Sequence, residues 1–477
     1  MKKTIIFYNP AAPYYTLPLQ YLALAAVVDK EKYDVEIIDA RIEKSTKHAH
    51  EKVKELLPNA LCLGVSVITG SPIVDSAAIT RLSKRFAPDV PVIWGGWHPS
   101  ILPEQCLREG HADYCIFGQG EITFPELLEA IENNGSLDGI HGLAFLKNGI
   151  FQRNADRKFV DINSFPPYDY DLLPLERYFE LKGRRQIDFY SSQGCPYRCA
   201  FCADPFVYGR RWSGLKGSRM LFDVFELLKR YNVEDINFQD ENFFANRNRV
   251  IEFCNGIDER KMNFTWAATS RADQIAPLDD ELLRIIAKAN LRKVMIGAES
   301  GSPEILELIK KDTLAEQAII SAEKLARFGI GATFNFIAGF PEEGFDNTLK
   351  TLDTIKEIKR IDNSFEFNIF FYTPYPGTEL FEYIKKKGYR VPHTLAEWSE
   401  IDFILYAGYW VSEVEREYVE RFKFYTKLST EHQYGGLLSY PLQQIARMRA
   451  RKDYYGFPIE KHVVNFVRHK VLQQVNW

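Results

Sequence analysis

The stretch that decides the fold is Gln186–Cys202. It begins with an apolar, strand-like segment, Gln186-Ile187-Asp188-Phe189-Tyr190-Ser191, which runs directly into Ser192-Gln193-Gly194-Cys195-Pro196-Tyr197-Arg198-Cys199-Ala200-Phe201-Cys202. A short apolar run that ends in a loop rich in reactive side chains is typical of a strand whose carboxyl end carries a site. The rest of the fold can be predicted outward from this junction.

Three of the seven cysteines lie in this loop, with the spacing C-x3-C-x2-C at Cys195, Cys199 and Cys202. Three thiolates on one loop can bind three irons of a 4Fe–4S cubane and leave the fourth iron open to a small chelating ligand. Tetrahedral zinc would require a fourth protein ligand, and no Cys or His pair stands nearby at zinc spacing. Gly194 lets the backbone turn toward a metal. The spacing therefore predicts a cluster-binding loop.

A series of strands and helices begins at this junction and continues toward the C-terminus. The predicted strands are Gln186–Ser191, Asp235–Gln239, Thr265–Ser270, Lys293–Ile296, Gly331–Ile337 and Phe365–Phe371. The segments between them carry helical patterns, such as Met220–Tyr231 and Arg247–Asp258. About six βα units predict a barrel or partial barrel, whose chemistry lies at the carboxyl ends of the strands.

A separate series of strands and helices precedes the junction. Its predicted strands are Thr4–Tyr8, Asp34–Asp39, Ala60–Val67, Val92–Trp94 and Tyr114–Phe117. The helical segments between them, such as Ile73–Phe86, give the alternation of a doubly wound parallel sheet. Strands buried on both faces are almost continuously apolar, as Leu61–Val67 is.

Together these patterns predict an α/β protein with an N-terminal Rossmann-like sheet, a partial βα barrel and a helical C-terminal region. The turn-rich texture of Asn163–Tyr170 marks a connection. Helical patterns in the last part cover Glu413–Leu428 and Lys461–Gln474. We therefore predict an N-terminal domain, a linker, a barrel and a helical domain over residues 1–140, 141–185, 186–387 and 388–477.

Bulk composition excludes several classes of function. With 46 % hydrophobic and 26 % charged residues, the 477-residue chain is a globular protein of two or three domains. A net charge of −4 offers no basic footprint for nucleic acid. No apolar run is long enough for a membrane span, and the N-terminus lacks the pattern of a signal peptide. We expect a cytoplasmic protein, in which cysteines stay reduced and a close group of them indicates a metal.

The second series resembles the radical S-adenosylmethionine (SAM) superfamily over about residues 186–380. The hallmark is the cysteine spacing with an aromatic residue, Phe201, before the last Cys. The resemblance implies a 4Fe–4S cluster, with SAM bound at its open iron. Later strand ends match in order. For SAM binding the resemblance implies Phe201 on the loop, Asp240 and Glu241 at the amino group, Arg271 at the carboxylate, and Glu299 and Ser300 in the following segment. Taken singly, the two acids also fit a helix start, Arg271 a surface position, and the last segment a turn.

The N-terminal series carries turn residues just after its predicted strands, where open α/β sheets bind ligands. Glycines there let the backbone approach a large flat ligand, and hydroxyl groups can bond its polar tail. The candidate binding residues are Pro10, Leu19, Thr69, Ser71, Gly95, Gly96, His98, Gly118, Gly120 and Glu121. The layout of residues 4–135 resembles the cobalamin-binding domain that precedes many radical SAM barrels. The D-x-H-x-x-G signature that supplies a His to cobalt is absent, and Asp39–Glu43 stands in its place. We therefore expect either that cobalamin binds without a protein His ligand or that the domain has lost cobalamin.

The resemblance implies an enzyme in which SAM is cleaved to a 5′-deoxyadenosyl radical that removes hydrogen from an unactivated carbon. Methylcobalamin would then methylate that carbon of a small-molecule, lipid or natural-product substrate, and an external one-electron donor of flavodoxin or ferredoxin type would supply the electron. Fused proteins of this kind include methylases and the anaerobic magnesium-protoporphyrin monomethyl ester cyclase. A cyclase or other oxidative ring-forming enzyme is therefore one alternative. A non-enzymatic redox or sensing protein with the same cofactors is the other.

Overall fold

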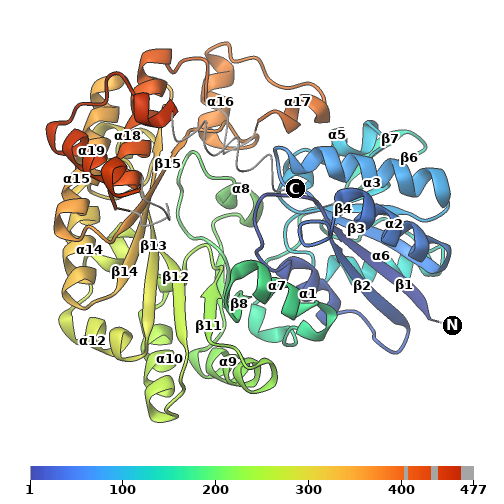
Figure 1. The fold of residues 1–477 in the computed structure, drawn as a ribbon. Helices are drawn as coiled ribbons and strands as arrows, with labels where there is room; N and C mark the ends of the chain where they lie inside the picture. The colour runs from blue at the N-terminus through green and yellow to red at the C-terminus, as the bar shows by residue number, and fades with distance from the viewer. Residues whose placement is uncertain (1, 402–406, 431–438, 463–477) are drawn as a thin grey trace.

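Two sheets built mainly of parallel strands stand side by side in the computed structural model, which describes residues 2–401, 407–430 and 439–462. Figure 1 shows the N-terminal sheet on the right and the second sheet on the left, with α7 (Leu175–Lys182) and α8 (Asp204–Tyr208) between them. The carboxyl ends of strands in both sheets contribute to the space between the two halves. This arrangement confirms the predicted fold class.

The N-terminal sheet has the strand order β2-β1-β3-β4-β5-β6-β7. Its parallel strands are β1 (Lys3–Asn9), β2 (Tyr33–Asp39), β3 (Ala60–Ser66), β4 (Val92–Gly95) and β5 (Tyr114–Ile116). The helices of this half are α1 (Leu19–Ala26), α2 (Thr46–Leu56), α3 (Pro72–Phe86), α4 (Trp97–Ile101), α5 (Pro103–Arg108) and α6 (Thr123–Glu132). All but the first residue of β1 are buried, as a central strand covered on both faces requires.

An antiparallel hairpin extends this sheet into the range predicted as a linker. Strands β6 (Leu143–Lys147) and β7 (Ile150–Arg153) follow β5 at the sheet edge. Their two-residue turn has Asn148 at φ 51° and Gly149 at φ 77°, the left-handed conformations that favour Asn-Gly in tight hairpins. Because β7 is exposed or half-buried, it lacks the continuous apolar run that revealed the inner strands. Residues 154–185 then cross to the second sheet, with α7 (Leu175–Lys182) near their end.

The second sheet is a six-stranded, all-parallel partial barrel with the order β15-β14-β13-β12-β11-β8. Its strands are β8 (Gln186–Phe189), β11 (Asp235–Phe238), β12 (Thr265–Arg271), β13 (Leu291–Glu299), β14 (Gly331–Ala338) and β15 (Glu366–Phe371). Its helices are α9 (Gly217–Tyr231), α10 (Arg247–Glu259), α11 (Ala272–Ile275), α12 (Asp280–Lys288), α13 (Pro303–Leu308), α14 (Glu316–Arg327) and α15 (Phe345–Ile361). The six strands are those the sequence predicts, with ends that differ by at most three residues.

Buried polar contacts join the two halves. The backbone N–H of Leu17 donates to Asp188 on β8 over 2.8 Å, and Lys182 donates to the same carboxylate over 2.5 Å. The hydroxyl of Tyr178 on α7 donates to Asp39, at the end of β2, over 2.6 Å. Since breaking a buried charged contact costs more than a surface one, these contacts favour a fixed placement of the halves.

The C-terminal region is helical and packs against both halves. It contains α16 (Glu379–Lys386), α17 (Leu395–Ser399), α18 (Glu413–Thr430) and α19 (Ser439–Lys452). The helix predicted over Glu413–Leu428 lies within α18, whereas nearly all of the one predicted over Lys461–Gln474 falls outside the described residues. Trp398 of α17 is fully buried, and its indole N–H donates to Gln105 of α5 over 3.1 Å.

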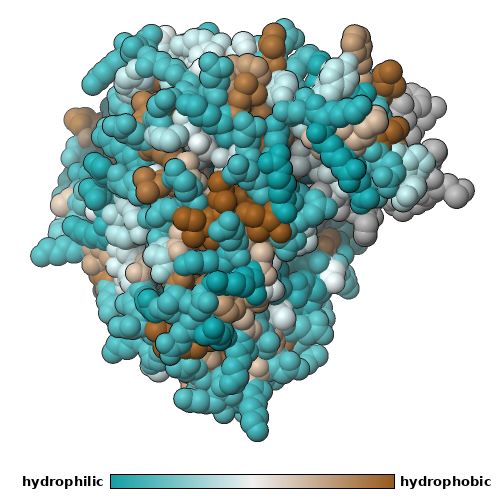
Figure 2. All heavy atoms as spheres, turned by 90° about the vertical axis from the view of Figure 1, so that its left-hand side faces the viewer, coloured by the Kyte–Doolittle hydropathy of each residue, from teal (hydrophilic) through white to brown (hydrophobic). Residues whose placement is uncertain are grey.

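The surface on the barrel side is mostly hydrophilic. Figure 2 views the molecule from the left-hand side of Figure 1, and a single group of hydrophobic residues stands out near the middle of this face. Within the described part of the chain, no helix combines the length and apolar character needed to cross a membrane.

Candidate active site

The cysteine loop is held open by a small antiparallel ribbon. After β8, strand β9 (Ser192–Gly194) pairs with β10 (Trp212–Gly214), and the short helix α8 (Asp204–Tyr208) lies between them. Gly194 has φ 78°, and a Cβ there would collide with the carbonyl oxygen of Arg211. Only glycine therefore fits the turn that leads into Cys195.

The three cysteines lie on this loop with no disulfide between them. Cys199 is buried, while Cys195 and Cys202 are half-buried. Burial raises the pKa of the Cys195 thiol to about 11, and burial also raises the pKa of Cys202. Such thiols stay protonated until a metal displaces the proton.

The donor set fits a 4Fe–4S cluster. Ionisation of Cys195 or Cys199 would raise the pKa of Cys202 further, so the three sulfurs lie close enough to interact. In a cubane each Cys binds a different iron, and the sulfurs stand farther apart than the ligands of one ion. Among the described residues, no three His, Cys, Asp or Glu side chains are gathered around a point that a single metal ion would occupy.

Arg271 lies against the cluster loop, while its predicted contact with the SAM carboxylate stays a prediction. At the end of β12, its guanidinium donates to the sulfur of Cys199 over 3.3 Å and to the carbonyl oxygen of Lys311, and it pairs with Asp273 over 2.9 Å. It also stacks on the ring of Tyr197, 3.7 Å from the ring centre. Arg271 therefore organises the loop itself.

Asp240 and Glu241 follow β11 but have different surroundings. The Asp240 carboxylate is buried and accepts hydrogen bonds from Ser191, Ser192 and Arg249, so it supports the start of the cysteine loop. Glu241 faces the cavity described below, and one of its carboxyl oxygens is buried without a partner. Burial, with the charge of a nearby acid, raises the pKa of Glu241.

The other predicted SAM residues already have partners within the fold. Glu299 accepts from the buried Lys311 over 2.7 Å, and Ser300 shares a hydrogen bond with Thr351 over 3.0 Å. Phe201 packs edge-on against Phe340, with ring centres 6.0 Å apart. Their predicted contacts with SAM stay predictions.

Asp204 is a site residue that sequence reasoning missed. It is 2 % exposed, both of its carboxyl oxygens lack hydrogen-bond partners, and burial raises its pKa. Its charge raises the pKa values of Cys195, Cys202 and Glu241, so it lies near all three groups. The only signal in the sequence is an acid two residues after the last Cys, where helix N-terminal acids are also common.

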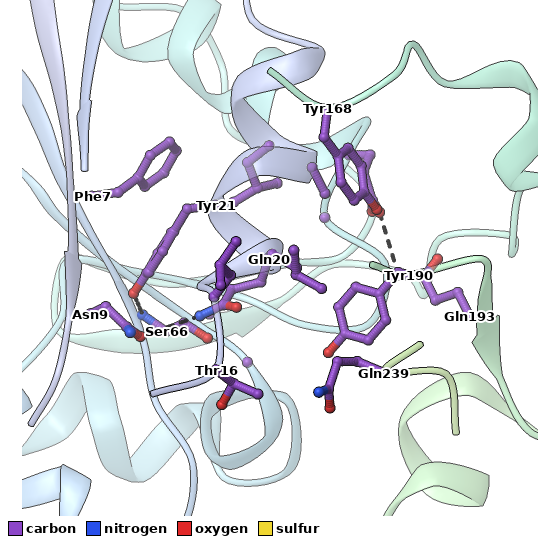
Figure 3. Close-up of a pocket in the computed structure, with 18 of the residues that line it drawn as sticks. Phe7, Asn9, Thr16, Gln20, Tyr21, Ser66, Tyr168, Tyr190, Gln193 and Gln239 are labelled. Atoms are coloured by element: carbon purple, nitrogen blue, oxygen red, sulfur yellow. Dashed lines mark hydrogen bonds between the residues drawn. The ribbon is translucent and has the colours of Figure 1, made fainter. Parts of the chain in front are cut away.

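A cavity of about 380 Å³ lies between the two halves. Seven of the ten predicted cobalamin residues line it, namely Pro10, Leu19, Gly95, Gly96, Gly118, Gly120 and Glu121. The barrel and the connecting segment contribute others, including Tyr168, Tyr190, Gln193, Gln239 and Glu241. Figure 3 shows Tyr190 and Gln239 across the cavity from Asn9 and Tyr21, with the Tyr168 ring directed toward Tyr190. The connecting segment is thus part of the cavity wall.

The N-terminal wall has the features of a cradle for a large ligand. Gly96 has φ 94°, and a Cβ there would come within 2.9 Å of the Ser66 hydroxyl. The side-chain nitrogen of Asn9 is buried without a partner, and Tyr21 accepts from the Ser66 N–H over 2.7 Å (Figure 3). Close backbone approach and a free polar group fit cobalamin, which is broad and carries amide side chains.

The remaining three predicted cobalamin residues do not line the cavity. His98 is fully buried, makes a 3.0 Å hydrogen bond with Thr69 and packs edge-on against Trp398. Ser71 lies at the start of α3. None of the described lining residues is a His. Asp39, at the place of the missing cobalt-ligand signature, pairs with Arg41 over 2.7 Å.

Comparison with known protein families agrees with this geometry. Residues 7–128 match the B12 binding domain family, and residues 189–355 match the radical SAM superfamily. The first range covers the N-terminal wall of the cavity up to α6, and the second contains the cluster loop and most of the barrel. The fold and the site thus define a cobalamin-dependent radical SAM enzyme.

Individual relatives show the family. An uncharacterized methyltransferase of Pyrococcus horikoshii is 31 % identical over 400 residues, 83 % of this chain and 84 % of that protein. The anaerobic magnesium-protoporphyrin IX monomethyl ester cyclase of Rubrivivax gelatinosus is 26 % identical over 74 % of this chain, which spans 63 % of the cyclase. The cobalamin-dependent SAM radical enzyme OxsB shares the fold, with a TM-score of 0.72 at 18 % identity over 95 % of this chain and 76 % of that chain. The chain belongs to the radical SAM family whose members carry an N-terminal B12-binding domain.

Proposed function

We propose that the enzyme methylates an unactivated carbon of a small-molecule, lipid or natural-product substrate held between its two halves. The observation that carries this proposal is the shared cavity. Its walls come from the turns of the N-terminal sheet on one side and from the residues beside the cluster loop on the other. The methyltransferase of Pyrococcus horikoshii, similar over most of this chain, supports the same reaction class.

Cys195, Cys199 and Cys202 would hold the cluster, and when bound the cofactors would supply the electron, the hydrogen-abstracting radical and the methyl group. The protein keeps the loop in shape through Gly194 and Arg271. The half-buried ring of Phe201 packs against the buried Phe340, which would help to keep water from that side of the loop. The chain's own part is therefore positioning and exclusion of side reactions.

The carboxyl groups of Glu241 and Asp204 are the strongest candidates for the SAM amino group. Both have buried oxygens without partners, and a bound ammonium would satisfy them. The contact of Arg271 with Cys199 supports its predicted role at the SAM carboxylate, which would bind beside the cluster. Asp240 would act indirectly, through the loop it supports.

Cobalamin would lie against the glycine-rich turns of the N-terminal sheet, without a cobalt ligand from a His side chain. An external electron carrier of flavodoxin or ferredoxin type belongs to the same proposal, as does a cytoplasmic location in which the thiols stay reduced. Cleavage of a sulfonium by one electron requires such a donor, because the reaction consumes an electron in each turnover.

Anaerobic reconstitution tests the proposal. The purified chain is loaded with iron, sulfide and hydroxocobalamin, and is then reduced and given SAM. Candidate substrates are chosen from the reactions of the enzymes that neighbouring genes encode. We expect absorbance of both cofactors, formation of 5′-deoxyadenosine, and a product heavier by one methyl group. Cys199→Ala should not bind the cluster and should not cleave SAM. Cys254→Ala, at a buried cysteine of α10, should bind the cluster and cleave SAM. SAM cleavage retained by Cys199→Ala would refute the assignment.

Ring formation or oxidation is the second candidate, because the cyclase of Rubrivivax gelatinosus is also similar over 74 % of this chain. It predicts a product that has lost hydrogen or gained oxygen and has gained no methyl group. A protein that binds both cofactors but forms no 5′-deoxyadenosine with any substrate would instead point to redox sensing.

A further inference from the structure

Two glutamine side chains join the cluster loop to the N-terminal half. The amide of Gln119, in the turn after β5, donates to the side-chain oxygen of Gln193 over 2.8 Å. The amide of Gln193 in turn donates to a carboxyl oxygen of Glu121 over 3.4 Å. We call these three residues the Gln193 link.

The link is anchored on both sides. Gln119 also accepts from the backbone N–H of Val160 over 2.8 Å and donates to the carbonyl oxygen of the same residue over 3.1 Å, which ties the connecting segment to the turn. Gln193 lies in β9, where it pairs with Ser213 of β10, two residues before Cys195. The link therefore runs from the turn of the N-terminal sheet to the first cluster ligand.

The surroundings make this link more than a surface contact. Gln119 is 5 % exposed and Glu121 is 8 % exposed, and Glu121 and Gln193 both line the cavity. Figure 3 shows Gln193 beside Tyr190 on the barrel side of the cavity. Because a buried amide that loses its partner is left unsatisfied, the hydrogen bonds favour one relative placement of turn and loop.

We propose that Gln193 is a positioning residue that keeps the cluster loop in register with the turn Gly118–Glu121 across the cavity. This inference rests on the proposed function, in which the radical is formed on the barrel side and the methyl group is held on the N-terminal side. An error in that register separates the two steps of the reaction without removing either cofactor. SAM is then cleaved, but the substrate carbon is out of place for methyl transfer.

Gln193→Leu and Gln119→Leu break the link from opposite sides with side chains of similar size. In both variants we expect wild-type contents of iron and corrinoid, and a ratio of 5′-deoxyadenosine to methylated product that rises roughly tenfold to a hundredfold, the usual effect of a small misplacement at a reacting centre. Because the two residues form one link, the double variant should be no worse than either single one.

Gln105→Leu is the control, since Gln105 also joins the N-terminal half to another region, at Trp398 and His393, away from the cavity. Its ratio should equal that of the wild type.

Hydrogen exchange of the cofactor-free chain provides a second measurement that needs no turnover. Each single variant should speed exchange in both segments, 118–121 and 192–195, because each releases the partner on the far side. The positioning proposal is overturned if exchange rises only in the mutated segment, or if Gln193→Leu has the product ratio of the wild type. The proposed methylation itself is not contradicted by either result. If the wild type forms no methylated product, the proposed function fails, and the exchange pattern alone decides whether the link sets the register.

Discussion

The guanidinium of Arg271 donates a hydrogen bond to the sulfur of Cys199 over 3.3 Å, and these two residues stand 72 positions apart in the chain. The contact joins the end of β12 to the middle of the cluster loop. Arg271 also contacts Asp273, Tyr197 and the carbonyl oxygen of Lys311, so it connects three segments of the barrel mouth. Since the side chain is already engaged, its first role is to shape the loop that receives the cluster.

Arg271→Lys should therefore weaken the loop even though it keeps the positive charge. Lysine has no planar fork and cannot meet Cys199, Asp273 and Lys311 together. We expect the free energy of unfolding of the cofactor-free chain to fall by about 1–3 kcal/mol, the cost of lost buried hydrogen bonds to charged groups. Urea unfolding and the iron content after reconstitution measure the two effects.

The matched control is Arg247→Lys, because Arg247 forms a half-exposed surface pair with Asp279. Surface pairs contribute little, so this variant should unfold and bind iron like the wild type. If Arg271→Lys also behaves like the wild type, the loop does not depend on this arginine.

Gly194→Ala tests whether the turn before Cys195 is obligatory. Alanine at φ 78° is strained, and its Cβ would also collide with the carbonyl oxygen of Arg211. Gly149→Ala is the control, since Gly149 has φ 77° with nothing within 4 Å of its added Cβ. We expect Gly149→Ala to cost about 1 kcal/mol of stability with full iron content. Gly194→Ala should cost more and lose iron, and equal behaviour of the two variants would contradict the assigned role of Gly194.

Most of the fold could be predicted because each buried strand is a short apolar run. All eleven predicted strands occur, and the parallel arrangement of the six barrel strands follows from their alternation with helices. The hairpin β6–β7 was missed since one of its strands is largely exposed and its pattern resembles that of a loop. The cysteine loop was found because its three ligands are contiguous in the sequence.

The cavity could be predicted only in part, because its walls are assembled from distant segments. Turn residues such as Gly95 and Gly118 follow a general rule for open sheets, and they line the cavity. Nothing local in the sequence places Tyr168 or Tyr190 opposite them. His98 was selected for its position near a turn, but the helical backbone of α4 turns its ring inward, toward Thr69 and Trp398.

Gly95→Leu should block cobalamin while sparing the cluster. The nearest atom to a Cβ added at Gly95 is the carbonyl oxygen of Ile116 at 3.9 Å, so the backbone tolerates a side chain there. Because Gly95 lines the cavity, a leucine would occupy space on the wall assigned to the corrinoid. We expect corrinoid absorbance after reconstitution to fall at least roughly tenfold, in line with the cost of overpacking a filled site. Iron content in the same samples is the internal control, and undiminished corrinoid binding would place the cofactor elsewhere.

Glu343 gives the chain a pH-dependent stability that its neighbour Glu342 does not share. Glu343 is 3 % exposed with one carboxyl oxygen unpartnered, and burial, helped by the charge of Glu415, raises its pKa from 4.5 to about 7. Between these two values the folded chain keeps a proton that the unfolded chain releases, so the free energy of unfolding should fall as the pH rises through this window, by up to about 3 kcal/mol. Glu343→Gln cannot release a proton, and it should therefore unfold at higher urea than the wild type at pH 8 and at similar urea at pH 5. Glu342→Gln is the control, because Glu342 lies on the surface beside Lys387 and Tyr383, and its pKa is lowered by these contacts. The free energy of unfolding of Glu342→Gln should change between pH 5 and pH 8 by as much as that of the wild type. If Glu343→Gln shows the same change, the Glu343 carboxyl is already ionised in the folded chain.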